Sequence, residues 1–450
     1  MAPAVDVVPF SQLSPPLVPS SDQKEYYSTG LRRRFQLDGL RVAPSGSSSA
    51  PSANVGYEVD ESKFRERTEA RLKLGNLPSA APQGWPTEVK GPLVWSTQDF
   101  PNEDEYVYTL TETDITEIEE ALGLFKEHDL DGSEVSSVLF PLPVLGSRLD
   151  KLRQDVYSGR GFVIIRGLDP DRHTEEDTTI IYLGLSSYIA ERRGKQDQRG
   201  SMLSKKKPQP TMVLPADFGS AIVHVIKRND ETDGQFSEDK PFHTDTVTDC
   251  LGLYTYNLPE AGGRSILASA WTVYNELAAT RPDLIHVLAQ EDWPFDTFGR
   301  NPPFYKRALL YHHDSKIILS FSRRLLVGHL PFMPRSPGIP GLTEAQAEAM
   351  DAVHFLAKKH EFRPRMLKGD LRLINNMAIM HRREAFENSS LHSRHLVRMW
   401  LNNEEACWKL PGPLRIAWAR IFDDEEREGH WDIMPVRKNG KILRVAGSCD

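Results

Sequence analysis

The 450-residue sequence contains only three cysteines, Cys250, Cys407 and Cys449. Thiolate zinc sites use closely spaced cysteine pairs, and a disulfide framework needs more cysteines than these, so neither is expected. A chain with so few cysteines, none of them paired by spacing, is typical of a reducing compartment. We therefore expect a cytoplasmic protein.

Long apolar runs are also missing. None approaches the roughly 18 residues that cross a bilayer, and the N-terminus lacks the basic segment that opens a secretory signal. Basic residues are not in excess either, because the net charge is −8 and the pI is about 6.0. This balance argues against a nucleic acid or an anionic membrane as the partner.

The composition changes near residue 55. The stretch over residues 42–54 reads VAPSGSSSAPSAN, which buries too little apolar surface to offset its chain entropy. We therefore expect a disordered arm over 1–55. The rest, with 39% hydrophobic and 26% charged residues in the whole chain, is globular in composition. It is predicted to form a single domain over 56–450, with an N-terminal helical extension and helical insertions.

Helices are predicted where apolar residues recur at helical spacing. Four begin at a Ser or Thr that is followed three residues later by Asp or Gln, a capping pair; in one of these the pair is Ser147 and Asp150. The predicted ranges are 111–126, 147–157, 174–190, 343–359 and, without such a pair, 271–288.

Short β-rich runs dominate the remainder. Strands are predicted at 161–167, 221–226, 242–247, 252–256, 265–268, 309–312, 317–321, 371–375 and 396–401. Residues 191–218 form an irregular basic loop, and the Asn-Gly pair within 438–441 predicts a hairpin turn. Many short strands with inserted helices, rather than a βαβα alternation, indicate a mainly β fold with flanking helices, either a β-sandwich or a jelly roll.

The pattern His-x-Asp/Glu occurs four times and is a weak signal alone. The pair His173/Glu175 lies in a charged helix-start loop, His312/Asp314 is predicted at a hairpin tip, and His430/Asp432 has no later histidine to complete it. The pair His243/Asp245 precedes a strand. On a strand, residues two apart share one face.

His381, in the segment NNMAIMHRR, supplies a distant third ligand for the His243/Asp245 pair. Two histidines and one carboxylate on one face of an octahedron leave three positions open, as iron(II) needs when it binds oxygen and a bidentate keto acid. We therefore predict an iron site at His243, Asp245 and His381, and expect Asp245→Ala to lose iron while keeping its fold.

The ordered set HTD, GGRS, NNMAIMHRR and RHLVRMW resembles the taurine dioxygenase (TauD/TfdA) family, in its clavaminate-synthase-like branch, over roughly residues 95–405. The resemblance implies a double-stranded β-helix (jelly roll) that uses Fe(II), O2 and 2-oxoglutarate. It implies that the keto acid is decarboxylated to succinate and CO2 while a small-molecule substrate is hydroxylated, desaturated or cyclised.

The resemblance also implies roles for three further residues. Ser265 follows the paired glycines, near the keto-acid carboxylate. Arg394, thirteen positions after His381, matches the arginine that holds the far carboxylate of 2-oxoglutarate, a task suited to a guanidinium fork. Arg398 falls where some members contact an acidic substrate group, which would favour a small acid or amino acid. A salt bridge to a protein acid, or a shared grip on 2-oxoglutarate, stays open for Arg398.

Two other functions are considered. One is a protein or peptide hydroxylase with the same chemistry, which would need a cleft that the 191–218 loop does not close. The other is a non-catalytic metal-binding jelly roll, against which Arg394 speaks because it has no purpose without an anion. Succinate release in the presence of iron(II), 2-oxoglutarate and oxygen separates this last function from an enzyme.

Overall fold

The computed structural model describes residues 52–196, 204–205, 239–245, 248–297, 303–330, 334–389, 391–423, 437–438 and 441–442. All but the last four residues of the expected arm over 1–55 lie outside these ranges. So do the predicted strand at 221–226, most of the 191–218 loop and the His430/Asp432 pair.

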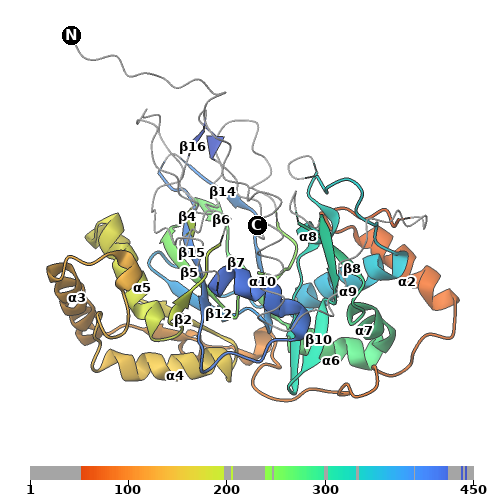
Figure 1. Ribbon diagram of the computed structural model, residues 1–450, viewed down its shortest axis with the longest axis horizontal. Helices are drawn as coiled ribbons and strands as arrows, with labels where there is room; N and C mark the ends of the chain where they lie inside the picture. Colours follow the sequence, from red (N-terminus) through yellow and green to blue (C-terminus); the bar gives the residue numbers. More distant parts are fainter. Residues whose placement is uncertain are drawn as a thin grey trace, which may run out of the picture. The chain divides into compact units, whose positions relative to one another are not determined.

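A mixed seven-stranded sheet lies at the centre of the described residues (Figure 1). The pairing of β1 with β2 is parallel, and every other pairing in this sheet is antiparallel. In spatial order the strands are β1 (Val107–Thr109), β2 (Phe162–Arg166), β12 (Leu371–Asn375), β5 (Cys250–Asn257), β15 (His395–Asn402) and β3 (Arg192–Arg193), with β4 (Ser204–Lys205) also paired to β15.

Side chains alternate between the two faces of this sheet, and each face packs into its own hydrophobic core. One core takes Val163, Tyr254, Leu373 and Met399 together with three helices. These are α3 (Glu112–Glu127), α4 (Leu145–Tyr157) and α5 (Glu175–Ser187), which gather on one side in Figure 1. The strand period of two therefore decides which residues face the helices and which face the opposite layer.

The opposite core holds Ile164, Leu253, Ile374 and Trp400. Facing it are two-stranded ladders: β7 (Ser265–Ser269) with β13 (Ile379–Arg383), β6 (Ala261–Gly262) with β14 (Phe386–Glu387), β8 (Trp293–Asp296) with β9 (Phe304–Arg307), and β10 (Leu310–His313) with β11 (Lys316–Leu319). The helices beyond are α2 (Glu61–Lys73), α6 (Ala270–Thr280), α7 (Pro282–Leu288), α8 (Arg323–Val327), α9 (Glu344–Lys359) and α10 (Gly412–Phe422). Short 3-10 turns lie at Thr97–Asp99, Glu103–Glu105, Gly132–Glu134 and Pro170–Arg172.

This arrangement confirms a sheet flanked by helices, while the jelly-roll topology itself stays a prediction. Helices α3, α5 and α9 begin behind the predicted caps Thr111, Thr174 and Thr343. No described helix combines the length and apolar character that a membrane crossing requires.

Two helix predictions were wrong in detail. Helix α4 begins at Leu145, so Ser147 lies inside it and is no cap. Its first amides, at Val144 and Leu145, instead donate to the Glu117 carboxylate of α3, at 2.7 and 3.0 Å. The predicted helix over 271–288 is two helices, because α6 ends before Pro282, which starts α7.

The predicted strand over 242–247 is also not regular where it is described. His243 forms only an isolated bridge with His381, and residues 246–247 lie outside the described ranges. The hairpin at His312 is confirmed, since Asp314 and Ser315 have φ of 49° and 60° between β10 and β11. Pairing of β16 (Arg437–Lys438) with β17 (Lys441–Ile442) confirms the C-terminal hairpin.

The first described residues are tied to the domain. The amide of Ala53 donates to the carbonyl of Leu342 at 2.8 Å, and the Arg67 guanidinium donates to the carbonyl of Asn54 at 2.7 Å. The described contacts thus include residues just before the expected boundary at 55.

Candidate metal centre

His243, Asp245 and His381 come together as predicted. All three are buried, and one ligand atom from each lies within 4.8 Å of the others. Two imidazoles and one carboxylate at this spacing suit a first-row metal such as iron(II), and leave room for further ligands.

Paired backbones hold the two histidines in register. The amide of His243 donates to the carbonyl of His381 at 3.0 Å, and the reverse bond is 2.8 Å. The His243 Nδ1 lies 3.0 Å from the carbonyl oxygen of Pro241, which fixes the tautomer that carries its proton on Nδ1. That tautomer presents Nε2 as the ligand atom, the usual arrangement behind a metal-bound histidine.

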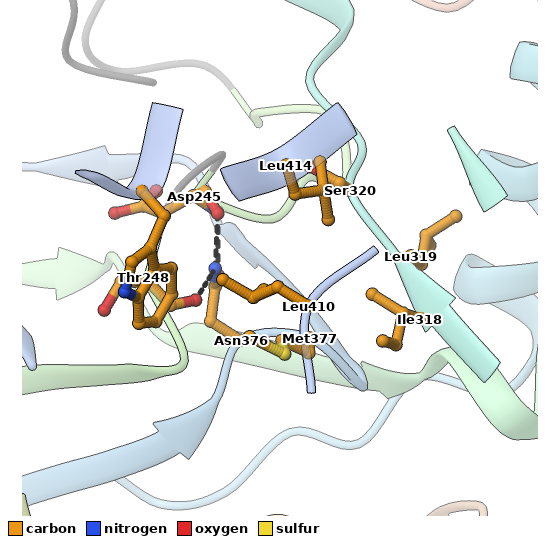
Figure 2. A pocket seen from close by; sticks show the side chains of 10 residues that line it. Asp245, Thr248, Ile318, Leu319, Ser320, Asn376, Met377, Leu410 and Leu414 are labelled. Atoms are coloured by element: carbon orange, nitrogen blue, oxygen red, sulfur yellow. Dashed lines mark hydrogen bonds between the residues drawn. The ribbon is translucent and has the colours of Figure 1, made fainter. Parts of the chain in front are cut away.

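The side chain of Asn376 fixes the backbone of Asp245 (Figure 2). Its Oδ1 accepts from the amide of Asp245 at 2.7 Å, while its Nδ2 donates to the carbonyls of Asp245 and of Thr248, the latter at 2.9 Å. The Asn376 side chain thus forms hydrogen bonds that a neighbouring strand would otherwise form. These bonds hold Asp245 although it lies outside any regular strand.

The two oxygens of the Asp245 carboxylate have different environments. Oδ2 accepts a 2.5 Å hydrogen bond from Trp400 Nε1 and lies 3.2 Å from Arg398 Nη1. Oδ1 accepts no hydrogen bond from any residue in the described ranges and lies 3.7 Å from His381 Nε2. The protein thus engages one oxygen and directs the other toward the histidines, as a single metal–oxygen bond requires.

Arg398 contacts Asp245, and a salt bridge to a protein acid is one of the possibilities left open from the sequence. Its Nε also donates to Gln196 Oε1 at 3.1 Å, and Gln196 Nε2 donates back to the Arg398 carbonyl at 3.1 Å. A role for Arg398 toward 2-oxoglutarate or a substrate carboxylate stays a prediction.

Arg394 contacts the short segment of chain that carries Ser265. Arg394 Nε donates to the carbonyl of Gly263 at 2.8 Å, and Ser265 is two residues further on. Gly263 has φ +73°, and a Cβ there would lie 2.9 Å from Arg394 Cδ, so a larger residue would displace the guanidinium.

The two other His-x-Asp/Glu pairs within the described ranges do not join the cluster. His173 precedes helix α5, and its Nε2 lies 3.3 Å from Glu119 of α3. His312 lies in the β10–β11 hairpin, whose turn begins at Asp314.

Trp400 and Asn376 are the site residues that sequence reasoning missed. Trp400 belongs to the core that faces the ladders and is also a donor to a predicted iron ligand. The signal was present, because Trp400 lies two residues after Arg398 on a strand and must share its face.

A pocket opens beside Asp245 and Asn376 (Figure 2). Its wall is mostly apolar. The apolar side chains are Ile318, Leu319, Met377, Leu410, Leu414 and Trp418. The last two belong to α10, which the sequence analysis did not predict.

Two buried titratable groups lie behind the ligands. Burial raises the pKa of Asp249 to about 7, although Tyr157 donates to its carboxylate at 2.9 Å. Burial lowers the pKa of His354 to about 3, so it is neutral and its Nδ1 accepts from the Phe242 amide at 3.2 Å. The neutral His354 supports the backbone before His243 without adding charge, and burial favours the protonated form of Asp249.

A buried pair of imidazoles and a carboxylate, held between a central sheet and a facing strand ladder, defines a mononuclear non-haem metal site. Comparison with known proteins identifies the family. The chain matches the taurine catabolism dioxygenase TauD, TfdA family over residues 128–400.

Individual relatives agree with this match. The taurine hydroxylase-like protein SAT17 of Stachybotrys chartarum is 33% identical over 350 residues, covering 76% of this chain and 88% of the relative. FR-33289 synthase of Streptomyces rubellomurinus is 23% identical, covering 70% and 91%. A solved asparagine oxygenase bound to Fe(II), 3-hydroxyasparagine and succinate has a TM-score of 0.49 at 17% identity, covering 66% of this chain and 93% of its own.

The chain therefore belongs to the TauD/TfdA family. It is a 2-oxoglutarate-dependent dioxygenase that uses Fe(II) and O2.

Proposed function

We propose that the enzyme hydroxylates a small acidic or amino-acid-like compound in the cytoplasm, with desaturation or cyclisation as variants of the same hydrogen abstraction. Succinate and CO2 are its co-products. The catalytic unit is a single jelly-roll domain over 56–450, and its metal ligands are His243, Asp245 and His381. The observation that carries the proposal is the approach of these three buried ligands to within 4.8 Å of one another.

Iron(II), when bound, supplies the oxidising chemistry by activating oxygen at the expense of the keto acid. The residues of the chain bind and orient. Arg394 takes the distal carboxylate of 2-oxoglutarate and Ser265 offers it a hydroxyl, while Trp400 and Arg398 hold one oxygen of Asp245. Arg398 is also the candidate contact for a substrate acid.

The nature of the substrate rests on the neighbourhood of Asp245. Arg398 supplies a buried positive charge there, and the pocket beside it carries apolar side chains from α10. A charge next to an apolar wall favours a small acid with a carbon chain. The name of the family, taurine catabolism dioxygenase, and that of the relative, taurine hydroxylase-like, also favour an amino-acid-like substrate.

The test is a screen of small acids and amino acids for substrate-stimulated succinate release by the iron-loaded enzyme. We expect stimulation by a compound that carries one acidic group, and no release when iron or 2-oxoglutarate is omitted. Succinate release that responds to peptides and to no small acid would favour a peptide hydroxylase instead. The 191–218 loop, which bears on that alternative, lies mostly outside the described residues.

A further inference from the structure

Arg372 of β12 is a buried arginine that the metal site described so far does not use. Its side chain is among the largest fully buried ones of the described residues. Its guanidinium contacts three neutral atoms: Ser265 Oγ at 2.8 Å, Thr255 Oγ1 at 2.9 Å and Met366 Sδ at 2.8 Å. Within the described ranges no carboxylate forms an ion pair with it.

The acid closest along the chain is already engaged. Both oxygens of Asp370 accept from Arg166, at 2.9 and 3.0 Å. A buried cation without an anion is costly, since an unpaired charge loses its hydration and receives no compensating partner. Burial accordingly lowers the pKa of Arg372 to about 10. An anion beside Arg372 would offset this cost.

The position of Arg372 shows where such an anion would lie. In the central sheet Leu253 of β5 is paired with Arg372 on one side and with Arg398 on the other. Directly paired residues on adjacent strands share a face, so both arginines project from the face that carries Trp400 and Ile374 toward the strand ladder of β7 and β13. The Arg372 side chain spans from the sheet to this ladder, because its hydrogen-bond partner Ser265 lies on β7.

Arg394 reaches the same segment of the opposite layer. It stands four residues before Arg398 on the chain and contacts the carbonyl of Gly263, two residues before Ser265. Two guanidinium groups thus meet the single segment 263–265 of the opposite layer, Arg394 at Gly263 and Arg372 at Ser265. An anion that both groups contact would offset the charge of each.

We infer that Arg372 is a second arginine for the distal carboxylate of 2-oxoglutarate, acting beside Arg394 and through the Ser265 hydroxyl. The inference rests on the proposed function, because it takes Ser265 to face the keto acid. In this arrangement Ser265 Oγ accepts from Arg372 and directs its own hydrogen toward the carboxylate. The site would then be more selective for a dicarboxylic keto acid than one arginine allows.

The experiment compares two keto acids that differ only at the far end. 2-Oxopentanoate has a methyl group where 2-oxoglutarate has its distal carboxylate, and both chelate iron(II) through the same keto-acid head. Their affinities for the anaerobic Fe(II) enzyme are read by calorimetry and by the visible charge-transfer band of the chelate, with no turnover needed. The variant is Arg372→Met, which keeps the volume and removes the charge.

We expect Arg372→Met to weaken 2-oxoglutarate about 30-fold or more, which corresponds to the lower end of the cost of truncating a buried charge pair. The affinity for 2-oxopentanoate should be unchanged within about a factor of three. A loss that is equal for both acids, or absent for both, would overturn the inference and leave Arg372 as a link between the layers. A wild-type protein that binds neither acid with iron(II) would instead refute the proposed function.

Arg307→Met is the matched control. Arg307 is buried to the same degree and also has neutral acceptors, the carbonyls of Ala308 and Ser320, at 3.1 and 3.3 Å. This control should lower stability without changing the ratio of the two affinities. If Arg372→Met does not fold, Arg372→Lys replaces it, and it should lose part of the preference because an ammonium cannot hold a carboxylate with a fork. If Arg372→Lys and Ser265→Ala each keep the wild-type preference for 2-oxoglutarate over 2-oxopentanoate, the inference is contradicted.

Discussion

Replacing Asp245 should cost folding stability as well as iron. The sequence alone led us to expect an intact fold in Asp245→Ala, but the side chain is fully buried and lies 3.2 Å from Arg398, whose side chain is 6% exposed. It also accepts from Trp400 Nε1. Removing one partner of a buried ion pair typically costs about 3–5 kcal/mol. We expect a loss of this size in the free energy of unfolding of the metal-free protein.

A double-mutant cycle separates this cost from the loss of the metal ligand. Arg398→Met removes the stranded charge, so Asp245→Ala/Arg398→Met should be more stable than Asp245→Ala, with a coupling free energy of about 2 kcal/mol. Urea unfolding of chelator-treated proteins measures the stabilities, and calorimetry with Fe(II) measures binding. Iron affinity should be lost in both variants that lack Asp245. If Asp245→Ala unfolds at the wild-type urea concentration, or the two changes add, the ion pair contributes nothing and the reasoning is wrong.

Three further outcomes are expected. Burial raises the pKa of Asp249 from 3.8 to about 7, so its contribution to stability is present below about pH 4 and is lost as the pH rises through 7. Asp249→Asn should lose less stability than the wild type between pH 5 and 8 in urea titrations, by at most about 3 kcal/mol. Trp400→Phe removes a donor to the iron ligand and should lower Fe(II) affinity about 10- to 100-fold in calorimetry, whereas an unchanged affinity would show that this hydrogen bond is dispensable. Deleting residues 1–51 should leave the melting temperature nearly unchanged, whereas deletion through Asp60 removes the α2 cap and the Ala53 backbone bond and should lower it.

Local chemistry made several elements predictable from sequence. The caps at Thr111 and Thr343 and the strand over 371–375 needed only neighbouring residues for their interpretation, and the structure confirms them. The start of α4 was missed because its first amides are satisfied by Glu117, about 30 residues away in the chain. A cap supplied by another helix leaves no trace in the local sequence.

The residues of the site likewise divide into those that the sequence predicts and those that it does not. The ligand triad was found from spacing and order along the chain, and its approach in space follows. The partner of Arg398 could not be fixed, because its Asp245 contact depends on the register of β15 against β5. For Arg372 the pattern gave no hint at all, since an arginine in an apolar strand is recognised as unusual only when its burial and its neutral partners are known.

The link between segments 243–245 and 376–381 has a consequence for how the metal arrives. Two backbone bonds join His243 to His381, and the Asn376 amide joins the second segment to Asp245. The ligand segments therefore lose little conformational entropy when the ion binds. Hydrogen-exchange protection around these ligands should be almost the same in the metal-free and the metal-bound protein. The metal-free protein is thus expected to keep a preorganised metal site through cycles of iron loss and reloading, rather than refold around each new ion.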